Sequence, residues 1–260
     1  MGRVDFSTVT EVTGYRLSRE QIQRMYTRYR FASEFCEGKE VLEVACGSGQ
    51  GLGYLAKKAK KVIGGDIDEN NLKFAREYYK DKENIELKIL DAHKLPFDNN
   101  NFDLVILYEA IYYLVNPEQF VKEAKRVLRK GGNLLICTAN KDWSGFNPSP
   151  YSHKYFSAHE LFGLLKQNNF GDIVLYGDCP VIAKTFKNII ISWIKRRAVA
   201  LKIIPKTMEG KELLKRIFYG KLLPLPPEIS GGMAEYTPPV SIPYDSPNFG
   251  YKVLYVVGYK

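Results

Sequence analysis

Residues 41–53, VLEVACGSGQGLG, decide the fold of this chain. The apolar run at 41–44 predicts a short parallel strand that is buried on both faces. A glycine-rich turn follows at 47–49, and a helical pattern begins at Leu52. A strand, a glycine turn and a helix form the start of a nucleotide-binding βαβ unit, because glycine has no β-carbon to keep a ligand away from the backbone.

The glycine turn differs from the dinucleotide fingerprint G-x-G-x-x-G. Counted from Gly47, the third glycine position is occupied by Leu52. Glu43 lies inside the preceding strand, where a carboxylate suits a positively charged ligand better than a pyrophosphate. A tight turn without any ligand is the alternative, and the acids after the next two strands make it the weaker interpretation.

Asp66 and Asp91 follow the next two predicted strands, 61–66 and 85–90. Asp66 stands about twenty residues after the glycine turn, where doubly wound folds place the acid that binds ribose. Its carboxylate can accept hydrogen bonds from both vicinal hydroxyls. Asp68 also suits the N-cap of the following helix, so we assign the ribose to Asp66. Asp91 is either a ligand acid or an ordinary turn aspartate.

These segments resemble the class I S-adenosylmethionine-dependent methyltransferases of the type 11 group, whose first motif reads (V/I)-L-(D/E)-x-x-C/G-G-(S/T)-G. The run LPFDNNNFD at 95–103 is also typical of that family. The resemblance extends without a gap from about residue 39 to residue 170. It implies S-adenosyl-L-methionine as the cofactor and S-adenosyl-L-homocysteine as its product.

The resemblance also implies a set of cofactor-binding residues. A helix before the first motif closes over the cofactor in the family, and a capping box at Ser18 predicts such a helix through about residue 35. Arg28 would bind the methionine carboxylate, since a guanidinium matches a carboxylate, although an exposed helix arginine is equally plausible. Asp91 would accept from the adenine amino group. The whole set is Arg28, Tyr29, Glu43, Ala45, Gly47, Gly49, Asp66, Ile67, Asp91, Ala92 and Tyr108.

The predicted fold class is α/β, with a doubly wound, seven-stranded and mostly parallel sheet of the Rossmann-like methyltransferase type. The later strands are predicted at 102–107, 133–138, 173–176 and 251–257. Asn116 is expected to cap a helix that begins at Pro117 and ends at Gly131 and Gly132, and a capping box at Ser157 predicts the next helix. An insertion separates the last two strands. The domain prediction is a helical cap at 1–38, a core at 39–178 plus 249–260, and a basic, partly proline-rich insertion at 179–248.

Composition adds one strong asymmetry. The chain of 260 residues has a net charge of +9, and residues 184–221 contain eleven basic and two acidic residues, so this segment carries the whole excess. Three roles are open for it: a helical pair with a solvated basic side, a lid over the acceptor, or an interfacial helix that touches the inner face of a membrane. Four cysteines without metal-ligand spacing and residues 1–12 without a secretory pattern predict a cytoplasmic protein without a metal site.

Methyl transfer from a sulfonium is an in-line displacement, so the protein must align acceptor, methyl carbon and sulfur. An oxygen acceptor usually also needs a base within hydrogen-bond reach. The candidates are His153, Glu109 and Tyr113, with Tyr112 and Asp142 nearby. Histidine titrates nearest neutral pH, although a lone histidine more often packs or forms a structural hydrogen bond.

The leading functional hypothesis is methylation of a small molecule, at a hydroxyl of a sugar or glycan precursor. It rests on the aromatic, Asn- and Ser-rich loop 140–156, which suits a sugar or phenol, and on similarity to methyltransferases that modify bacterial surface polysaccharide. A quinone or lipid acceptor at the membrane surface is the alternative. Nucleic acid is an unlikely acceptor because no N-P-P-Y type motif stands at 108–111. A cofactor-binding protein without catalysis is the fourth hypothesis.

Overall fold

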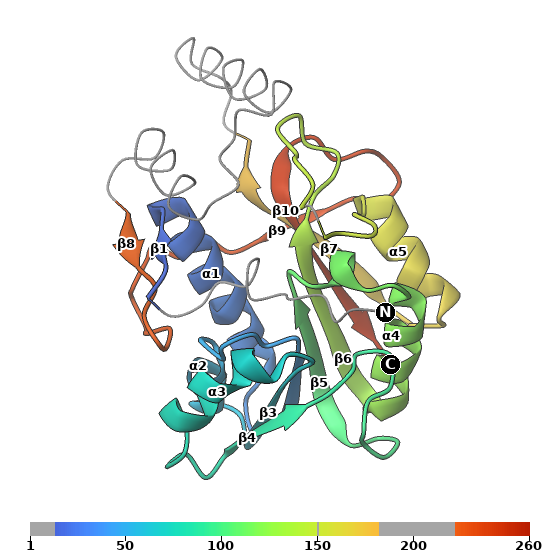
Figure 1. Ribbon diagram of the computed structural model, residues 1–260. Coiled ribbons are helices and arrows are strands. Elements are labelled where there is room, and N and C mark those ends of the chain that lie inside the picture. Colours follow the sequence, from blue (N-terminus) through green and yellow to red (C-terminus); the bar gives the residue numbers. More distant parts are fainter. Residues whose placement is uncertain (1–13, 150, 182–221) are drawn as a thin grey trace.

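The computed structural model describes residues 14–149, 151–181 and 222–260 (Figure 1). The basic segment 184–221, with its predicted membrane contact, lies outside the described residues. Eight strands form the main sheet in the order β4-β3-β2-β5-β6-β10-β7-β9. In chain order they are β2 (Glu40–Val44), β3 (Lys61–Asp66), β4 (Ile85–Ile89), β5 (Phe102–Tyr108), β6 (Leu128–Ala139), β7 (Ile173–Pro180), β9 (Val240–Ile242) and β10 (Tyr251–Tyr259).

The strand directions confirm the predicted doubly wound α/β class. The strands from β4 to β6 pair in parallel, and β10 enters antiparallel between β6 and β7. The sheet has one strand more than predicted, because β9 from the expected insertion pairs antiparallel with β7. The long connection between β7 and β10 therefore contributes to the edge of the main sheet.

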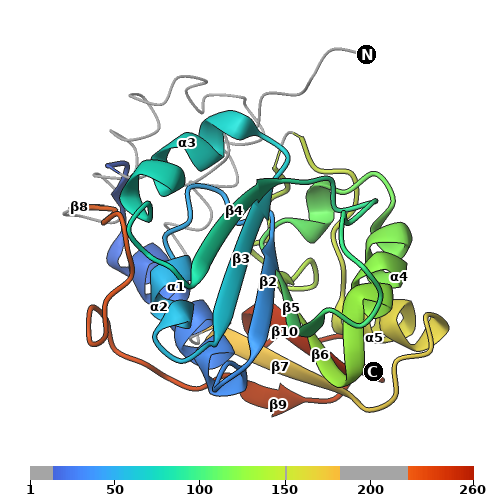
Figure 2. The same cartoon turned by 90° about the horizontal axis from the view of Figure 1, so that it is seen from below.

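Helices cover both faces of the sheet (Figures 1 and 2). One face carries α1 (Arg19–Ala32), α2 (Leu52–Ala56) and α3 (Glu69–Tyr78), and the other carries α4 (Pro117–Val127) and α5 (Ala158–Gln167). Successive side chains of each strand belong to the two halves of the core, one on each face of the sheet. Val41 packs with α1–α3, whereas Leu42 packs with α4 and α5. Because successive strand residues point to opposite faces, continuous apolar strands are what a sheet covered on both sides needs.

The helices begin where the sequence places their caps. Ser18 accepts from Gln21 N–H and Ser157 accepts from Glu160 N–H, and both form complete capping boxes. Asp68 and Asn116 cap α3 and α4 through their side chains. These four predicted caps are confirmed.

The predicted end of α4 is wrong. The helix ends at Val127, and β6 begins at once with Leu128, which is fully buried and pairs with Phe102. Burial of Leu128 in the sheet therefore outweighs the helical tendency of the residues before Gly131 and Gly132. The strand starts earlier, and its pairing with β5 is irregular between Phe102 and Leu104.

The described C-terminal part of the insertion, from residue 222 onward, holds α1 in place. A two-stranded sheet joins β1 (Arg16–Leu17), just before α1, to β8 (Leu223–Pro224). Ile229, which is fully buried, donates its N–H to Gln50 O at 2.9 Å beside the glycine turn. The short helices η2 (Ser33–Phe35) and η3 (Ile111–Tyr113) complete the described elements.

Candidate active site

A cavity of about 480 Å³ lies between α1 and the carboxyl ends of the parallel strands. This is the edge at which open α/β sheets bind ligands. All predicted site residues except Gly49 line it: Arg28, Tyr29, Glu43, Ala45, Gly47, Asp66, Ile67, Asp91, Ala92, Tyr108, Glu109, Tyr113 and His153. Topology thus brings together residues that are separated by up to 125 positions along the chain.

Gly47 and Gly49 have different roles in the glycine turn. Both have positive φ, 59° and 79°, which favours glycine. A Cβ on Gly49 would lie 2.9 Å from the Cβ of Ala75 in α3, so this residue is glycine because α3 packs against it. We therefore correct the predicted ligand contact of Gly49: it supports the turn from behind, and Gly47 faces the cavity.

Glu43 is the most unusual polar group of the cavity. It is 1% exposed, and its Oε1 accepts a 2.6 Å hydrogen bond from the Tyr29 hydroxyl. Its Oε2 is buried and has no hydrogen-bond partner among the described residues. Burial raises the pKa of Glu43 to about 7, against the opposing effects of the Tyr29 hydrogen bond and the Arg28 charge. A buried acceptor left without a donor indicates a ligand that supplies one.

Asp66 is largely occupied by the protein itself. Its Oδ2 accepts from Gly47 N–H at 2.9 Å, and its Oδ1 accepts from Asp68 N–H at 2.9 Å and from the Asn71 amide at 3.2 Å. Burial raises the pKa of this carboxyl group. A carboxylate has about four lone-pair positions, so roughly one stays open. Asp66 thus fixes the glycine turn and has room for about one further hydrogen-bond donor.

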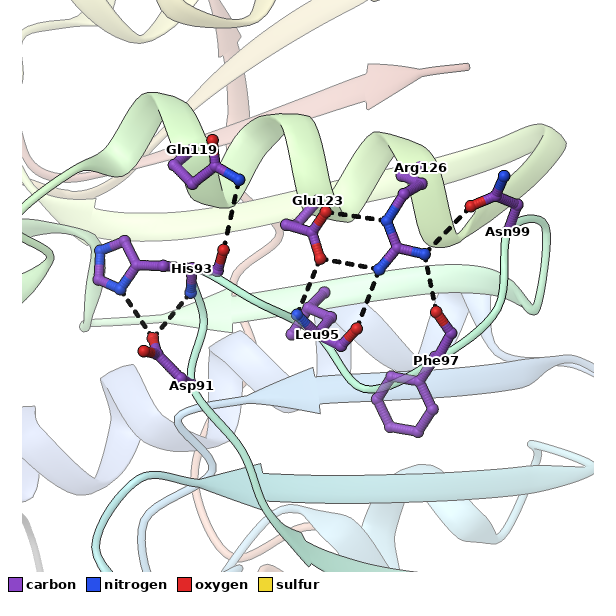
Figure 3. A network of polar contacts seen from close by, with 8 residues as sticks. All are labelled: Asp91, His93, Leu95, Phe97, Asn99, Gln119, Glu123 and Arg126. Carbon is purple, nitrogen blue, oxygen red and sulfur yellow. Dashed lines mark hydrogen bonds and ion pairs between the residues drawn. The ribbon is translucent and has the colours of Figure 1, made fainter.

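Asp91 and Ala92 begin a loop that α4 holds in place (Figure 3). Asp91 Oδ1 accepts two hydrogen bonds from His93, one from its backbone N–H at 2.8 Å and one at 2.7 Å from its Nδ1. His93 also lines the cavity. Sequence reasoning missed this histidine, although its position two residues after a candidate ligand acid was a usable signal.

Glu109, a predicted catalytic residue, is engaged at both oxygens. Its Oε1 lies 3.3 Å from the Arg24 guanidinium and 3.9 Å from that of Arg28. Its Oε2 accepts from the Tyr112 hydroxyl at 3.1 Å. Such a carboxylate orients two arginines in the cavity wall and is a poor free base. Arg24 was also missed, and the signal was its spacing of four residues from Arg28 on the same helix face.

The other two catalytic candidates lie in or beside η3. The backbone N–H of His153 donates to Tyr112 O at 2.7 Å, which fixes the histidine beside η3, and its ring is exposed at the cavity. The Tyr113 hydroxyl donates to Ser149 Oγ at 3.1 Å. Tyr108 lies deeper and donates to Arg28 O at 2.9 Å, and burial raises its pKa well above the usual value. Of these groups, His153 is the one placed to exchange a proton.

Two positive-φ residues other than glycine mark the cavity floor. Ala45 has φ of 56° and Glu109 has φ of 50°, and they follow β2 and β5 directly. Residues other than glycine avoid this region because of the Cβ, and such positions cluster at functional sites. Both belong to the predicted site.

The fold is that of the Rossmann-like methyltransferases. The YcgJ protein from Bacillus subtilis superimposes with a TM-score of 0.60 at 17% identity, covering 91% of this chain and 98% of that one. An S-adenosylmethionine-dependent methyltransferase from Thermotoga maritima gives 0.59 at 16% identity, covering 92% of each chain.

Sequence comparison finds similarity to methyltransferases over part of the chain. Residues 42–136 match the family described as "Methyltransferase domain". A protein of Mycolicibacterium smegmatis named "Probable S-adenosylmethionine-dependent methyltransferase" is 32% identical over 148 residues, which are 55% of this chain and 56% of that protein. A protein of Pseudomonas fluorescens named "Ubiquinone/menaquinone biosynthesis C-methyltransferase UbiE" is 32% identical over 142 residues, 51% of this chain and 54% of the relative.

The predicted resemblance to class I S-adenosylmethionine-dependent methyltransferases is therefore supported over this part of the chain. The matched region begins at Leu42, one residue into the motif at 41–53, and ends within β6. The chain spans little more than half the length of these two curated relatives. Among the described residues, no helix is both long and apolar enough to cross a membrane.

Proposed function

We propose that this protein transfers the methyl group of S-adenosylmethionine to a small-molecule acceptor, at a hydroxyl of a sugar or glycan precursor. The observation that carries the cofactor assignment is the buried, unpartnered Oε2 of Glu43, which faces a cavity also lined by Arg28. A buried acid and a basic side chain match the ammonium and carboxylate of an amino-acid group. S-adenosylmethionine has such a group at one end.

The other end of the cavity suits a nucleoside. Asp66 has room for one ribose hydroxyl, and Asp91 is an acceptor for the adenine amino group. Ile67 is 47% exposed and lines the cavity, so it offers an apolar surface to the adenine ring. When bound, S-adenosylmethionine supplies an electrophilic methyl group on a sulfonium.

The acceptor would enter beside η3. This rim of the cavity is lined by Tyr112, Tyr113 and His153, and Tyr112 stacks on Tyr155 at 4.4 Å between ring centroids. Tyrosines offer both ring faces and hydroxyls, which suits a sugar. His153 would take the hydroxyl proton, and the wall formed by Arg24 and Glu109 would orient the acceptor. The chemistry then depends on alignment and one proton transfer.

A quinone is the second candidate acceptor. Leu114 and Val115 line the same rim, and Val115 is 75% exposed, so part of the entrance is apolar. Several relatives are also named as quinone methyltransferases. A carbon acceptor of that kind would make less use of His153 as a base.

The test is to incubate the protein with S-adenosylmethionine labelled in the methyl group and with cell extract separated into aqueous small molecules, nucleic acid, and lipid or lipid-linked glycan. We expect label in sugar-containing material from the aqueous or glycan fraction. Label in free quinone would replace the sugar proposal with the alternative. No label in any fraction, together with no binding of S-adenosylhomocysteine, would overturn the proposed function.

A further inference from the structure

We propose that His93 is a positioning residue for the adenine end of the cofactor: its ring holds the Asp91 carboxylate in one orientation and thereby lets the site select an amino-substituted purine. This inference rests on the proposed function, because it assumes that adenine lies beside Asp91. It adds a positioning role for His93 to the roles proposed above.

The first step is the contact between the two side chains. The backbone N–H and the Nδ1 of His93 both bond to Asp91 Oδ1, at 2.8 and 2.7 Å. Oδ2 accepts no hydrogen bond from any described residue, so it is the oxygen left for a donor in the cavity. Asp91 is half exposed, with a side-chain exposure of 50%. Without a second anchor, an aspartate this exposed would sample several rotamers.

The second step is the state of the ring. The backbone N–H of Asn116 donates to His93 Nε2 at 3.2 Å. Nε2 therefore serves as an acceptor, and Nδ1 is the ring nitrogen placed to donate to Asp91. The ring is held from both sides, by the acid of the cavity and by the N-cap residue of α4.

The third step is the support of the loop backbone, which Figure 3 shows. The Gln119 amide donates to His93 O at 3.3 Å, and Glu123 accepts from Leu95 N–H at 2.8 Å. Arg126 donates to the carbonyl oxygens of Leu95 and Phe97 at 2.9 and 2.7 Å. The loop after Asp91 is thus fixed to α4. The His93 ring is therefore held in place and restrains the Asp91 carboxylate.

The consequence is selectivity at one position of the purine. A fixed carboxylate oxygen accepts from an exocyclic amino group and repels an exocyclic carbonyl oxygen. Loss of the restraint should weaken binding of the amino purine and change binding of the oxo purine little. A merely structural role of His93 would lower both affinities by the same factor.

The experiment measures dissociation constants of the full-length protein for S-adenosyl-L-homocysteine and for S-inosyl-L-homocysteine, in which an oxo group replaces the amino group. Two substitutions separate the two ring nitrogens. The amide nitrogen of asparagine can take the place of Nδ1, so His93→Asn keeps the donor to Asp91. The amide group of glutamine takes the place of Nε2, so His93→Gln loses that donor. Gln119→Ala is the control, since it removes a bond to the His93 carbonyl and leaves the ring contact.

We expect His93→Gln to weaken binding of the adenosyl compound about tenfold, because the ligand must then immobilise a carboxylate that the ring no longer restrains, with less than twofold change for the inosyl compound. In His93→Asn and Gln119→Ala, the ratio of the two dissociation constants should stay within about threefold of the parent's ratio. Equal losses for both ligands in His93→Gln, or an unchanged ratio, would overturn the inference and leave the proposed function standing. If the parent protein bound neither ligand, the proposed function would be overturned, and this inference, which rests on it, would be overturned too.

Discussion

The Tyr29 hydroxyl donates a 2.6 Å hydrogen bond to Glu43 Oε1 and so joins α1 to the end of β2 inside the cavity. Tyr29 also packs edge-on against Tyr108 and covers Gly51, where a Cβ would lie 1.8 Å from its ring. One side chain of the cap helix therefore orients the acid of the first motif and closes the glycine turn. This contact explains why the helix before the motif forms one wall of the cavity.

Tyr29→Phe should destabilise the protein. The substitution leaves the buried Glu43 carboxyl group without its donor, and a buried acceptor without a partner costs about 1–3 kcal/mol. We expect a fall of that size in the free energy of unfolding, measured by urea denaturation. Tyr78→Phe is the control, because Tyr78 is exposed and should change stability by less than about 0.5 kcal/mol. Equal stability of the two variants would contradict the role given to the contact.

Ligand binding should tighten as pH rises through neutrality. Glu43 has a pKa of about 7 in the free protein, raised by burial from 4.5, and a ligand ammonium favours its ionised form. Binding then releases up to one proton, and the dissociation constant of S-adenosylhomocysteine should fall about tenfold between roughly pH 6 and 8. Calorimetry in buffers of different ionisation enthalpy would count the protons. In Glu43→Gln the pH dependence should disappear.

Without ligand, the raised pKa of Glu43 makes the folded protein less stable as pH rises. Folded Glu43 holds its proton more tightly than the unfolded chain does, so this group adds nothing below about pH 4.5 and destabilises the fold progressively as pH rises toward about 7. The unfolding free energy of the parent should therefore fall relative to that of Glu43→Gln across this window. Parallel pH profiles of the two proteins would argue against a buried, protonated Glu43.

Gly49→Ala and Gly131→Ala form a matched pair. Their φ values are 79° and 78°, but a Cβ would lie 2.9 Å from Ala75 at Gly49 and meets nothing within 4 Å at Gly131. Gly131→Ala should cost about 1 kcal/mol for the backbone conformation alone. Gly49→Ala should cost a further 1–3 kcal/mol, roughly the penalty for overpacking a core, measured by the same denaturation. Similar losses at both sites would show that α3 moves away at little cost.

Glu109→Gln and His153→Ala should separate orientation from proton transfer. Glu109 orients Arg24 and Arg28, so its substitution should raise KM for S-adenosylmethionine and lower kcat by less than about tenfold. His153→Ala should lower kcat about a hundredfold for a hydroxyl acceptor and leave KM for the cofactor nearly unchanged. Asp142→Asn is a control outside the cavity lining. A hundredfold loss of kcat in Glu109→Gln would restore that residue as the base.

The sequence predicted those features that depend on local patterns. The apolar strands, the capping boxes at Ser18 and Ser157, and the order of the motif acids follow from periodicity and from hydrogen bonds within a few residues. The end of α4 was misjudged because the decisive interaction, pairing of Leu128 with Phe102, lies 26 residues away in sequence. The additional strand β9 was missed for the same reason, since three residues carry little periodic signal.

The amino-acid sequence by itself determined the class of fold, the glycine turn, and which residue types would meet at the carboxyl edge of the sheet, because parallel strands bring their ends together whatever the details of packing. Only the tertiary structure decided how those residues share their hydrogen bonds. It placed Tyr29 on Glu43, divided Asp66 among three protein donors, paired Arg24 with Glu109 and set His93 against Asp91. The contacts of Tyr29 with Glu43, of Gly47 with Asp66 and of Arg24 with Glu109 join separate segments, so packing fixes them and spacing along the chain does not.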